Sequence, residues 1–216
     1  MWDCIWRDEM IPVKILAVRY LANASPALAE ALGAPRGYRC LGLITTDCDD
    51  ATYIALDAAT KAAEVEVAYG RSFYAGAANA STPNAGEVIG ILAGATPGAV
   101  KSGMEAAVSA LSRVGFEEVN GVPYLAHTVS SVGSYLAKEA GVRTGSAIAY
   151  LIAPPLEGMY AMDSALKAAD VKLCKLYGPP SETNFGGGLL SGTQSACDAA
   201  CAAFAQAVAE VAGRPR

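Results

Sequence analysis

The sequence predicts an α/β protein made of two related modules, each a sandwich of a small β-sheet and α-helices. An internal repeat is the first observation: DAATKAAEV at 57–65 returns as DSALKAADV at 163–171, which is 163 − 57 = 106 residues later in a chain of 216. The second is that a Gly-rich stretch, an apolar Gly-containing segment and an Ala-rich helical pattern follow both copies. One supersecondary unit has been duplicated, and a duplicated unit suits assembly into a symmetric ring.

The first module is expected to begin with a strand and a short helix. Residues 13–18 alternate in polarity as a half-buried strand does. Ser25 and Pro26 are the residue types of a helix N-cap and first helical position, and Gly33 with Pro35 ends that helix. The remaining elements are a strand, the repeated helix, two strands and the Ala-rich helix, at 41–46, 53–63, 64–69, 89–94 and 97–111.

The second module repeats this plan after a cluster of turn residues at 115–121, so we divide the chain into domains at 1–115 and 116–216. Its strands are expected at 124–129, 148–152, 171–176 and 187–192, and its helices at 133–140, 159–169 and 194–211. The expected inward-facing residues of the repeated helices, at helical spacing, are Tyr53, Leu56, Thr60 and Ala63 in the first copy and Met159, Met162, Leu166 and Ala169 in the second.

Composition excludes several classes of function. The net charge of −5 with scattered Lys and Arg residues gives no basic stripe, which argues against nucleic acid and against an anionic membrane surface as partners. The charged fraction of 17% lies below the ~25% of an ordinary soluble domain, so we expect subunit contacts to cover part of the surface. The uncharged stretch 119–137 contains Asn, Pro, His and Ser residues and is rejected as a transmembrane helix.

The cysteines predict neither disulfides nor a metal site. Six of them form no C-x-x-C pair, and the start of the chain has no signal-peptide pattern, so we expect a reducing, cytoplasmic location. Cys197 and Cys201 lie one helical turn apart without the other ligands of a zinc site, which favours packing. No cofactor is expected either, because the glycines at 186–188 lack the GK[ST] ending of a phosphate loop.

The acidic turn before the repeated helix is the strongest candidate binding site. Asp47, Asp49 and Asp50 place three carboxylates within four residues, and like charges so close raise one another's pKa unless a cation lies among them. One interpretation is an ammonium or metal site completed by Glu87, with the ring face of Phe116 toward the cation. The alternative is structural: Asp50 caps the helix, and the other carboxylates are solvated.

Several strings resemble a known family. The helix pattern D-x-A-x-K-A-A-[ED]-V, followed by a strand and a Gly-rich turn, resembles the bacterial microcompartment shell domain. Four longer strings resemble the family of ethanolamine-utilization shell protein L: LGLITTDCDDATY at 41–53, YGRSFYAGA at 69–77, AYLIAPPLE at 149–157 and PPSETNF at 179–185. The resemblance covers roughly residues 11–212, and the first ten residues match nothing.

The resemblance implies two circularly permuted shell domains in tandem, without enzymatic activity. It implies a homotrimer that forms a pseudohexagonal tile and packs with other shell proteins. It also implies an acidic pocket near each small pore that binds ethanolamine, with the residues Asp49, Asp50, Glu87, Phe116 and Thr183. The family's tile-edge lysines correspond to Lys61 and Lys167, for which the alternative is a solvated helix face. The segment 130–133 departs from the family because it lacks an arginine that relatives often have.

Two loops occupy matching positions after the repeated helix and strand, at 71–86 and 178–188. Both are long and rich in residues that tolerate unusual backbone angles. We expect them to gate the centre of the trimer, with Phe73, Tyr74 and Phe185 closing the pore. The alternative is that both are ordinary ordered surface loops.

These observations predict a structural shell tile of an ethanolamine-metabolising bacterial microcompartment, with pores for small metabolites. The first alternative is the same tile in a compartment for ethanol or a diol. The second is a small cytosolic enzyme that uses His127, the only histidine, with Ser130 or Cys48. A histidine on an apolar strand is more often a core residue, and no recognisable nucleophile motif accompanies this one.

Overall fold

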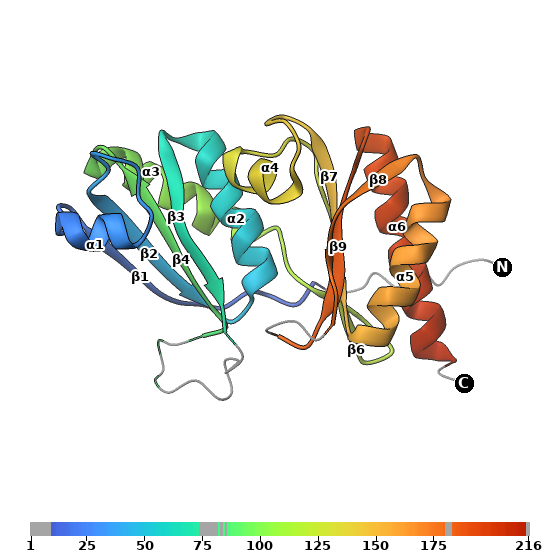
Figure 1. Ribbon diagram of the computed structural model, residues 1–216. Coiled ribbons are helices and arrows are strands. Elements are labelled where there is room, and N and C mark those ends of the chain that lie inside the picture. Colours follow the sequence, from blue (N-terminus) through green and yellow to red (C-terminus); the bar gives the residue numbers. More distant parts are fainter. Residues whose placement is uncertain (1–9, 74–81, 83, 85, 180–182, 215–216) are drawn as a thin grey trace.

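The computed structural model describes residues 10–73, 82, 84, 86–179 and 183–214. Two sheets, each with helices packed on it, form the molecule, as the sequence predicts (Figure 1), and the strands of both sheets pair antiparallel. The first sheet has the order β1-β2-β4-β3, with β1 (Ile15–Leu21), β2 (Cys40–Thr46), β4 (Val88–Gly94) and β3 (Val65–Ser72). Its module also contains α1 (Pro26–Ala31), α2 (Asp49–Ala62) and α3 (Pro97–Leu111).

The second sheet has the order β5-β6-β7-β9-β8. Its strands are β5 (Glu117–Val119), β6 (Val122–Val129), β7 (Ala147–Ala153), β9 (Gly186–Gly192) and β8 (Val171–Tyr177). Its module also contains α4 (Ser134–Ala140), α5 (Pro155–Ala168) and α6 (Gln194–Gly213). The expected elements form with ends displaced by a few residues. Strand β5 was not expected, because its residues fall within the predicted turn at 115–121, where they pair with β6 instead.

The two modules repeat one topology. Once β5 is set aside, β1-β2-β4-β3 corresponds to β6-β7-β9-β8, and both sheets are antiparallel throughout. Even the register irregularity recurs, between Val67 and Tyr69 in β3 and between Leu173 and Lys175 in β8. The domain limits 1–115 and 116–216 stay a prediction, which the break between the end of α3 and the start of β5 supports.

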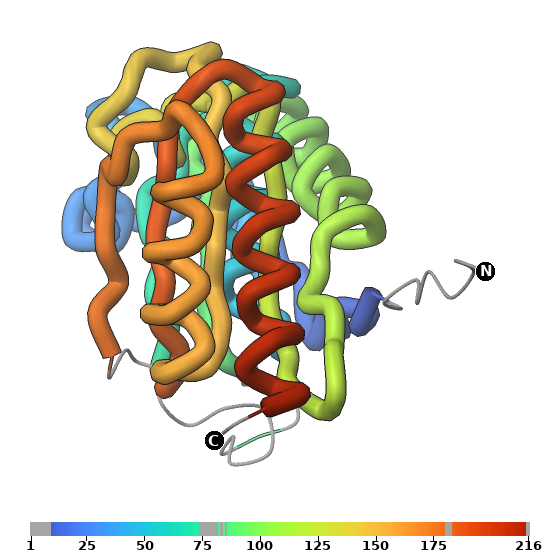
Figure 2. The backbone as a smooth tube through the Cα atoms, turned by 90° about the vertical axis from the view of Figure 1, so that its right-hand side faces the viewer, coloured from blue at the N-terminus to red at the C-terminus, as the bar shows by residue number. Residues whose placement is uncertain are grey.

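Helix α2 lies between the two sheets, α3 packs beside it on the first sheet, and α5 with α6 covers the outer face of the second sheet (Figures 1 and 2). The largest apolar core therefore joins the modules, since α2 and α3 share it with Leu125 and Ile148 of the second sheet. A separate core under α5 and α6 contains Leu151 and Phe204. Because both faces of its sheet are covered, β7 is buried along its whole length, and it is a continuous apolar run rather than an alternating one.

The predicted inward stripe of the repeated helix is only partly right. In α2 Leu56 is buried, but Tyr53, Thr60 and Ala63 are half-buried. The buried residues of α2 form a wider set: Asp49, Asp50, Ala51, Thr52, Ile54, Ala55, Leu56, Asp57 and Ala59. Those of α5 are Gly158, Ala161, Met162 and Ala165. The sequence could not indicate the extra burial of α2, because it comes from the second module packing against a side of α2 that faces away from its own sheet.

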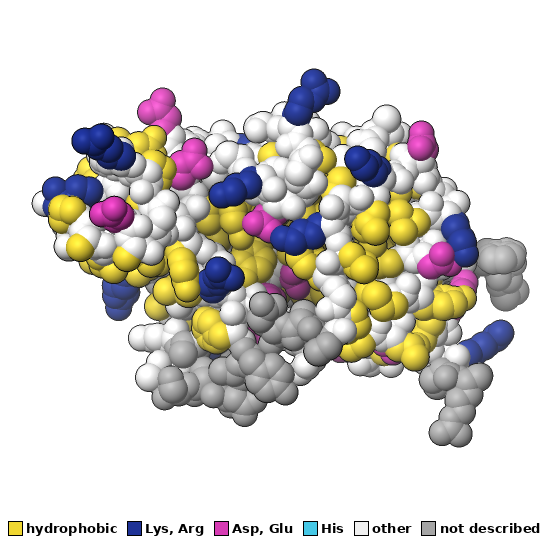
Figure 3. Space-filling model, viewed as in Figure 1, with side chains coloured by type: hydrophobic (Ala, Val, Ile, Leu, Met, Phe, Trp, Pro, Cys, Tyr) yellow, Lys and Arg dark blue, Asp and Glu magenta, His cyan; other side chains and the backbone are white. Residues whose placement is uncertain are grey.

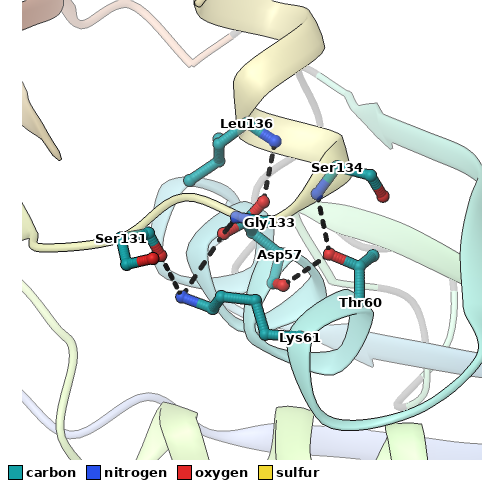
Figure 4. Close-up of polar contacts among 7 residues, drawn as sticks. All are labelled: Asp57, Thr60, Lys61, Ser131, Gly133, Ser134 and Leu136. Atoms are coloured by element: carbon teal, nitrogen blue, oxygen red, sulfur yellow. Dashed lines mark hydrogen bonds and ion pairs between the residues drawn. The ribbon is translucent and has the colours of Figure 1, made fainter. Parts of the chain in front are cut away.

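A buried carboxylate joins α2 to α4 (Figure 4). Asp57 is 0% exposed, and its two oxygens accept the N–H groups of Gly133 at 2.7 Å and of Leu136 at 2.8 Å. Lys61, one turn along α2, lies 3.6 Å from this carboxylate and donates to the carbonyl of Ser131 at 2.7 Å. A Cβ at Gly133 would lie 2.7 Å from the Asp57 carbonyl oxygen, so only glycine allows this close approach.

We predict that Asp57→Ala lowers the free energy of unfolding by about 3 kcal/mol, because two buried N–H groups lose their acceptor at about 1–3 kcal/mol each. Urea unfolding followed by circular dichroism measures the change. The control is Glu105→Ala on α3, which removes the acid of an exposed pair with Lys101 and should change the value by about 0.5 kcal/mol or less. Equal effects of the two substitutions would contradict the role assigned to Asp57.

Candidate functional site

The acidic turn opens into a cavity of about 220 Å³ between the two modules. Both modules contribute to its wall, together with the segment before β1. The lining residues are Ile11, Pro12, Val13, Asp47, Cys48, Asp49, Asp50, Glu87, Phe116, Pro123, Thr183 and Phe185. All five ligand residues that the sequence predicted, Asp49, Asp50, Glu87, Phe116 and Thr183, are among them. The space-filling view shows acidic side chains at the bottom of the hollow between the halves (Figure 3).

The end of β2 fixes the acidic turn. The Thr46 hydroxyl lies 2.7 Å from that of Thr52 in α2, and it accepts the N–H of Cys48 at 3.2 Å. Asp47 accepts the N–H of Lys14 at 2.8 Å, which holds the segment before β1 against the turn. Strand β2 therefore passes into α2 within two residues, and the carboxylates of the first turn of α2 reach the boundary between the modules.

Asp50 is buried against the second module. Its Oδ1 accepts the hydroxyl hydrogen of Tyr150 on β7 at 2.7 Å. The capping interpretation of Asp50 is therefore wrong: Cys48 is the N-cap of α2, and Asp50 is the second helical residue. Sequence reasoning missed Tyr150. The available signal was a tyrosine inside a fully apolar strand, since a buried tyrosine hydroxyl needs a hydrogen-bond partner.

The surroundings of Asp50 disfavour its negative charge. Burial raises its pKa well above the ordinary value, and the nearby charges of Asp49 and Glu87 raise it further. The hydrogen bond from Tyr150 acts in the opposite direction. Burial, followed by the charge of Asp50, also raises the pKa of the Cys48 thiol well above its ordinary value. The cavity is thus a place where a small cation would relieve an electrostatic cost.

A second, larger cavity of about 540 Å³ is also lined by the acidic residues Asp49 and Asp50. Its wall includes five tyrosines, of which four form two ring pairs: Tyr53 with Tyr135 at 6.1 Å between centroids, and Tyr150 with Tyr177 at 6.3 Å. The two cavities have four lining residues in common, which are Asp49, Asp50, Thr183 and Phe185. The acidic pair therefore lies where the two cavities meet.

Of the predicted gate residues, Phe185 lies in both cavities and contacts the Phe116 ring edge-to-face at 5.5 Å. The N–H of Phe73 donates to the carbonyl of Glu87 at 3.0 Å, and Tyr74 lies outside the described residues. The loop bounds need correction: residues 71–72 belong to β3 and residues 186–188 to β9, because both strands continue their ladder with the neighbouring strand.

The two predicted edge lysines lie in unlike surroundings within one chain. Lys61 is held at the contact of α2 with the segment before α4. Lys167 is largely exposed and forms an ion pair with Asp163 at 2.6 Å. Their predicted place at a tile edge depends on neighbouring molecules and stays a prediction.

The enzyme alternative gains no support from the geometry. His127 lies half-buried on β6 outside both cavities, and burial, followed by the nearby charge of Lys61, lowers its pKa. Cys48 is a poor nucleophile because its raised pKa keeps it a thiol. Among the described residues, no group of three or more His, Cys, Asp or Glu side chains could hold a metal ion. None of the described helices is long and apolar enough to span a membrane.

Comparison with known proteins identifies the family. The model of the BMC domain matches residues 40–123. The bacterial microcompartment shell protein EutL of Clostridium perfringens (strain 13 / Type A) is 56% identical over 213 residues, which cover 97% of this chain and 98% of that protein. EutL of Escherichia coli (strain K12) is 47% identical over 211 residues, with 96% of each chain covered.

A solved structure agrees with this over nearly the full length. The crystal structure of ethanolamine utilization protein EutL from Leptotrichia buccalis C-1013-b has a TM-score of 0.94 and 57% identity, covering 96% of this chain and 98% of that one. The expected fold class, two tandem shell domains, is confirmed. The relatives are named as shell proteins, which is a structural role and not an enzymatic one. The chain belongs to the EutL family of bacterial microcompartment shell proteins.

Proposed function

We propose that this shell protein is a trimeric tile in a microcompartment that metabolises ethanolamine, and that its acidic cavity binds ethanolamine. The observation that supports ethanolamine as the ligand is that Asp49, Asp50 and Glu87 line one small cavity. Burial, followed by repulsion from Asp49 and Glu87, raises the pKa of Asp50, and an ammonium group placed there would favour its charged form. Thr183 offers a polar group for the hydroxyl end of the ligand, and Phe116 offers a ring to the cation.

The expected affinity is modest. A ceiling of about −1.5 kcal/mol for each of roughly four non-hydrogen atoms gives about −6 kcal/mol, which corresponds to tens of micromolar at best. The negative charge of the cavity disfavours the alternative of a compartment for ethanol or a diol. A neutral alcohol cannot offset three carboxylates in a cavity where burial already disfavours the charge on Asp50.

The meeting of the two cavities at the acidic pair supports a path for small metabolites through each subunit. Phe185 lies where the cavities meet, so movement of its loop would alter both this path and the ligand site. If ethanolamine binds the closed form more tightly, it shifts the population toward closure by its differential affinity alone. Lys61 and Lys167 are assigned to the edge, where tiles meet other shell proteins.

The first test of the binding site is calorimetry with ethanolamine. We predict that Asp50→Asn weakens binding by about 1.5–3 kcal/mol, the range for hydrogen bonds to charged groups. Asp198→Asn on α6 removes one exposed charge outside both cavities and should leave binding unchanged. 1,2-Ethanediol, which has the same size but no ammonium group, should not bind. Undiminished binding to Asp50→Asn would remove the site assignment.

The raised pKa of Asp50 also predicts a pH dependence. A raised carboxyl pKa stabilises the folded protein below the ordinary aspartate pKa, and this contribution is lost as the pH rises through the raised value. The Asp50→Asn variant has no such carboxyl and therefore loses no stability in this way. Without ligand, its melting temperature minus that of the parent should increase from pH 4 to pH 8. Ethanolamine at pH 8 should raise the melting temperature of the parent by more than that of the variant, because the variant binds it more weakly. A pH-independent difference would contradict this electrostatic account.

Sedimentation velocity tests the tile itself. We expect one species with the mass of three chains at micromolar concentration, because the duplicated module needs three copies to fill six equivalent positions of a ring. Lys61→Ala with Lys167→Ala should keep that species while reducing the formation of extended sheets in electron micrographs. A stable monomer or dimer of the parent chain would overturn the trimeric tile.

A further inference from the structure

We propose that Tyr150 is a positioning residue of the ammonium site: it holds the Asp50 carboxylate in its charged form and leaves one carboxylate oxygen to the ligand. The inference rests on the proposed binding of ethanolamine and deepens it. Tyr150 lines the larger cavity and not the small one that holds the proposed ligand site. It therefore acts on the ligand through Asp50 and not by direct contact.

The Tyr150 hydroxyl is held in place by the second module. Strand β7 lies inside its sheet, and at this position it pairs with His127 of β6 and with Leu189 of β9. Tyr150 is 2% exposed, and its ring stacks on that of Tyr177 at 6.3 Å between centroids and 27° between planes. Its hydrogen bond to Asp50 Oδ1 at 2.7 Å thus joins two fixed elements, so the carboxylate is oriented before a ligand arrives.

The two carboxylate oxygens of Asp50 have different surroundings. Oδ1 accepts the hydroxyl hydrogen of Tyr150, and in the part of the chain that the structure describes no group donates to Oδ2. No buried side-chain oxygen in that part lacks a hydrogen-bond partner, so Oδ2 is not enclosed by protein and is open to the cavities that Asp50 lines. Oδ2 is therefore the oxygen that can accept a hydrogen bond from an ammonium group.

Of the groups that shift the pKa of Asp50, only Tyr150 favours the charged carboxylate. Burial raises this pKa most, and the charges of Asp49 and Glu87 raise it further, whereas the hydrogen bond from Tyr150 lowers it. A hydrogen bond to a charged acceptor is worth more than one to a neutral acceptor. The hydroxyl thus opposes the effects that favour the protonated carboxyl.

The other titratable groups around this carboxylate supply no charge that could replace the hydroxyl. Burial raises the pKa of the Cys48 thiol and of the Tyr53 and Tyr177 hydroxyls, so all three are neutral at pH 7. The Lys175 ammonium lies 5.2 Å from the centroid of the Tyr177 ring and is paired with Glu139 at 2.5 Å. Among the described residues, no basic side chain is one of the groups that shift the pKa of this carboxylate.

The duplicated fold shows that the backbone does not need this pair. Leu43 on β2 has the place of Tyr150: both are the fourth of seven residues in their strand, and both pair with the fourth residue of the next strand in the sheet. Leu156 has the place of Asp50, since each is the second residue of its helix. The hydroxyl and the carboxylate are absent together from the equivalent positions, so they belong to the acidic cavity and not to the fold.

Tyr150→Phe tests this role because it removes the hydroxyl and keeps the ring. Without the donor the charged form of Asp50 is less stable, so the carboxyl stays protonated to a higher pH. An ammonium compound that needs the charge then binds more weakly at low and neutral pH and recovers its affinity as the pH rises. Asp49, Asp50 and Glu87 interact, so the midpoint of this change belongs to the three carboxyls together.

Calorimetry with ethanolamine on the full chain, from pH 5 to pH 8.5, measures the change. A primary amine keeps its charge in this range, since its pKa is about 10. The pH midpoint of binding should be about one to two units higher in Tyr150→Phe than in the parent, with about tenfold to a hundredfold weaker binding below the parent's midpoint. A loss that is the same at every pH, or no loss at all, would overturn the proposal.

Tyr124→Phe is the matched control. Tyr124 is also a buried tyrosine of the second sheet, and its hydroxyl donates to a carboxylate, that of Glu117, at the same distance of 2.7 Å. It lies outside both cavities. This variant should keep the parent's pH midpoint for ethanolamine. An equal displacement of the midpoint in both variants would assign the effect to general loosening of the sheet and overturn the role of Tyr150.

Melting temperatures without ligand test the hydrogen bond independently of ethanolamine. Loss of the donor raises the Asp50 pKa further, and a raised carboxyl pKa costs stability as the pH rises through it. The melting temperature of Tyr150→Phe minus that of the parent should therefore fall from pH 5 to pH 8.5. In an Asp50→Asn background the same substitution has no carboxylate to affect, so its effect should not depend on pH.

The two series separate this proposal from the proposed function. If the parent binds no ethanolamine but the melting difference depends on pH as expected, the ligand assignment fails and Tyr150 still holds Asp50 in its charged form. If the melting difference is independent of pH in the presence of Asp50, the role of Tyr150 is overturned, even where ethanolamine binds.

Discussion

The buried carboxylate of Asp57 is the constraint that fixes the position of the two modules relative to each other. A charge with no exposure is stable only when hydrogen bonds replace its water, and here the N–H groups of Gly133 and Leu136 do so. These belong to the other module, so the bonds fix α2 against α4 in one position. Asp50 lies seven residues earlier on the same helix, about two turns away. Fixing α2 therefore also fixes Asp50 against Tyr150 and sets the width of the acidic cavity.

The packing that stabilises the fold also disfavours the negative charge in the acidic cavity. The covered sheet, the shared apolar core and Asp57 hold the modules together, and this places Asp50 where its charge is disfavoured. Such a site carries an electrostatic cost until a cation enters, and binding free energy is available because that cost is relieved. The proposed selectivity for a small ammonium compound would depend on the carboxylates and the cavity size together.

Duplication gave two copies of one backbone fold, and the side chains of the two copies differ where their surroundings differ. Where α2 begins with Asp49 and Asp50, α5 has Pro155 and Leu156, so the second module has no acidic turn. The cavity is thus built once in each chain although the backbone is built twice.

The sequence by itself determined the repeat and, apart from β5, the order of strands and helices, and the family resemblance named five of the residues that line the acidic cavity. Periodicity and turn residues are local signals, and the family strings contain Asp49, Asp50 and Thr183, whereas Glu87 and Phe116 lie outside those strings. Only the tertiary structure decided what depends on distant segments. It buried α2 on an unexpected side, paired Glu117–Val119 as a strand, and gave Asp50 the hydroxyl of Tyr150 instead of a capping role. The physical reason is that burial and hydrogen-bond partners belong to the space between elements, where residues 100 positions apart meet.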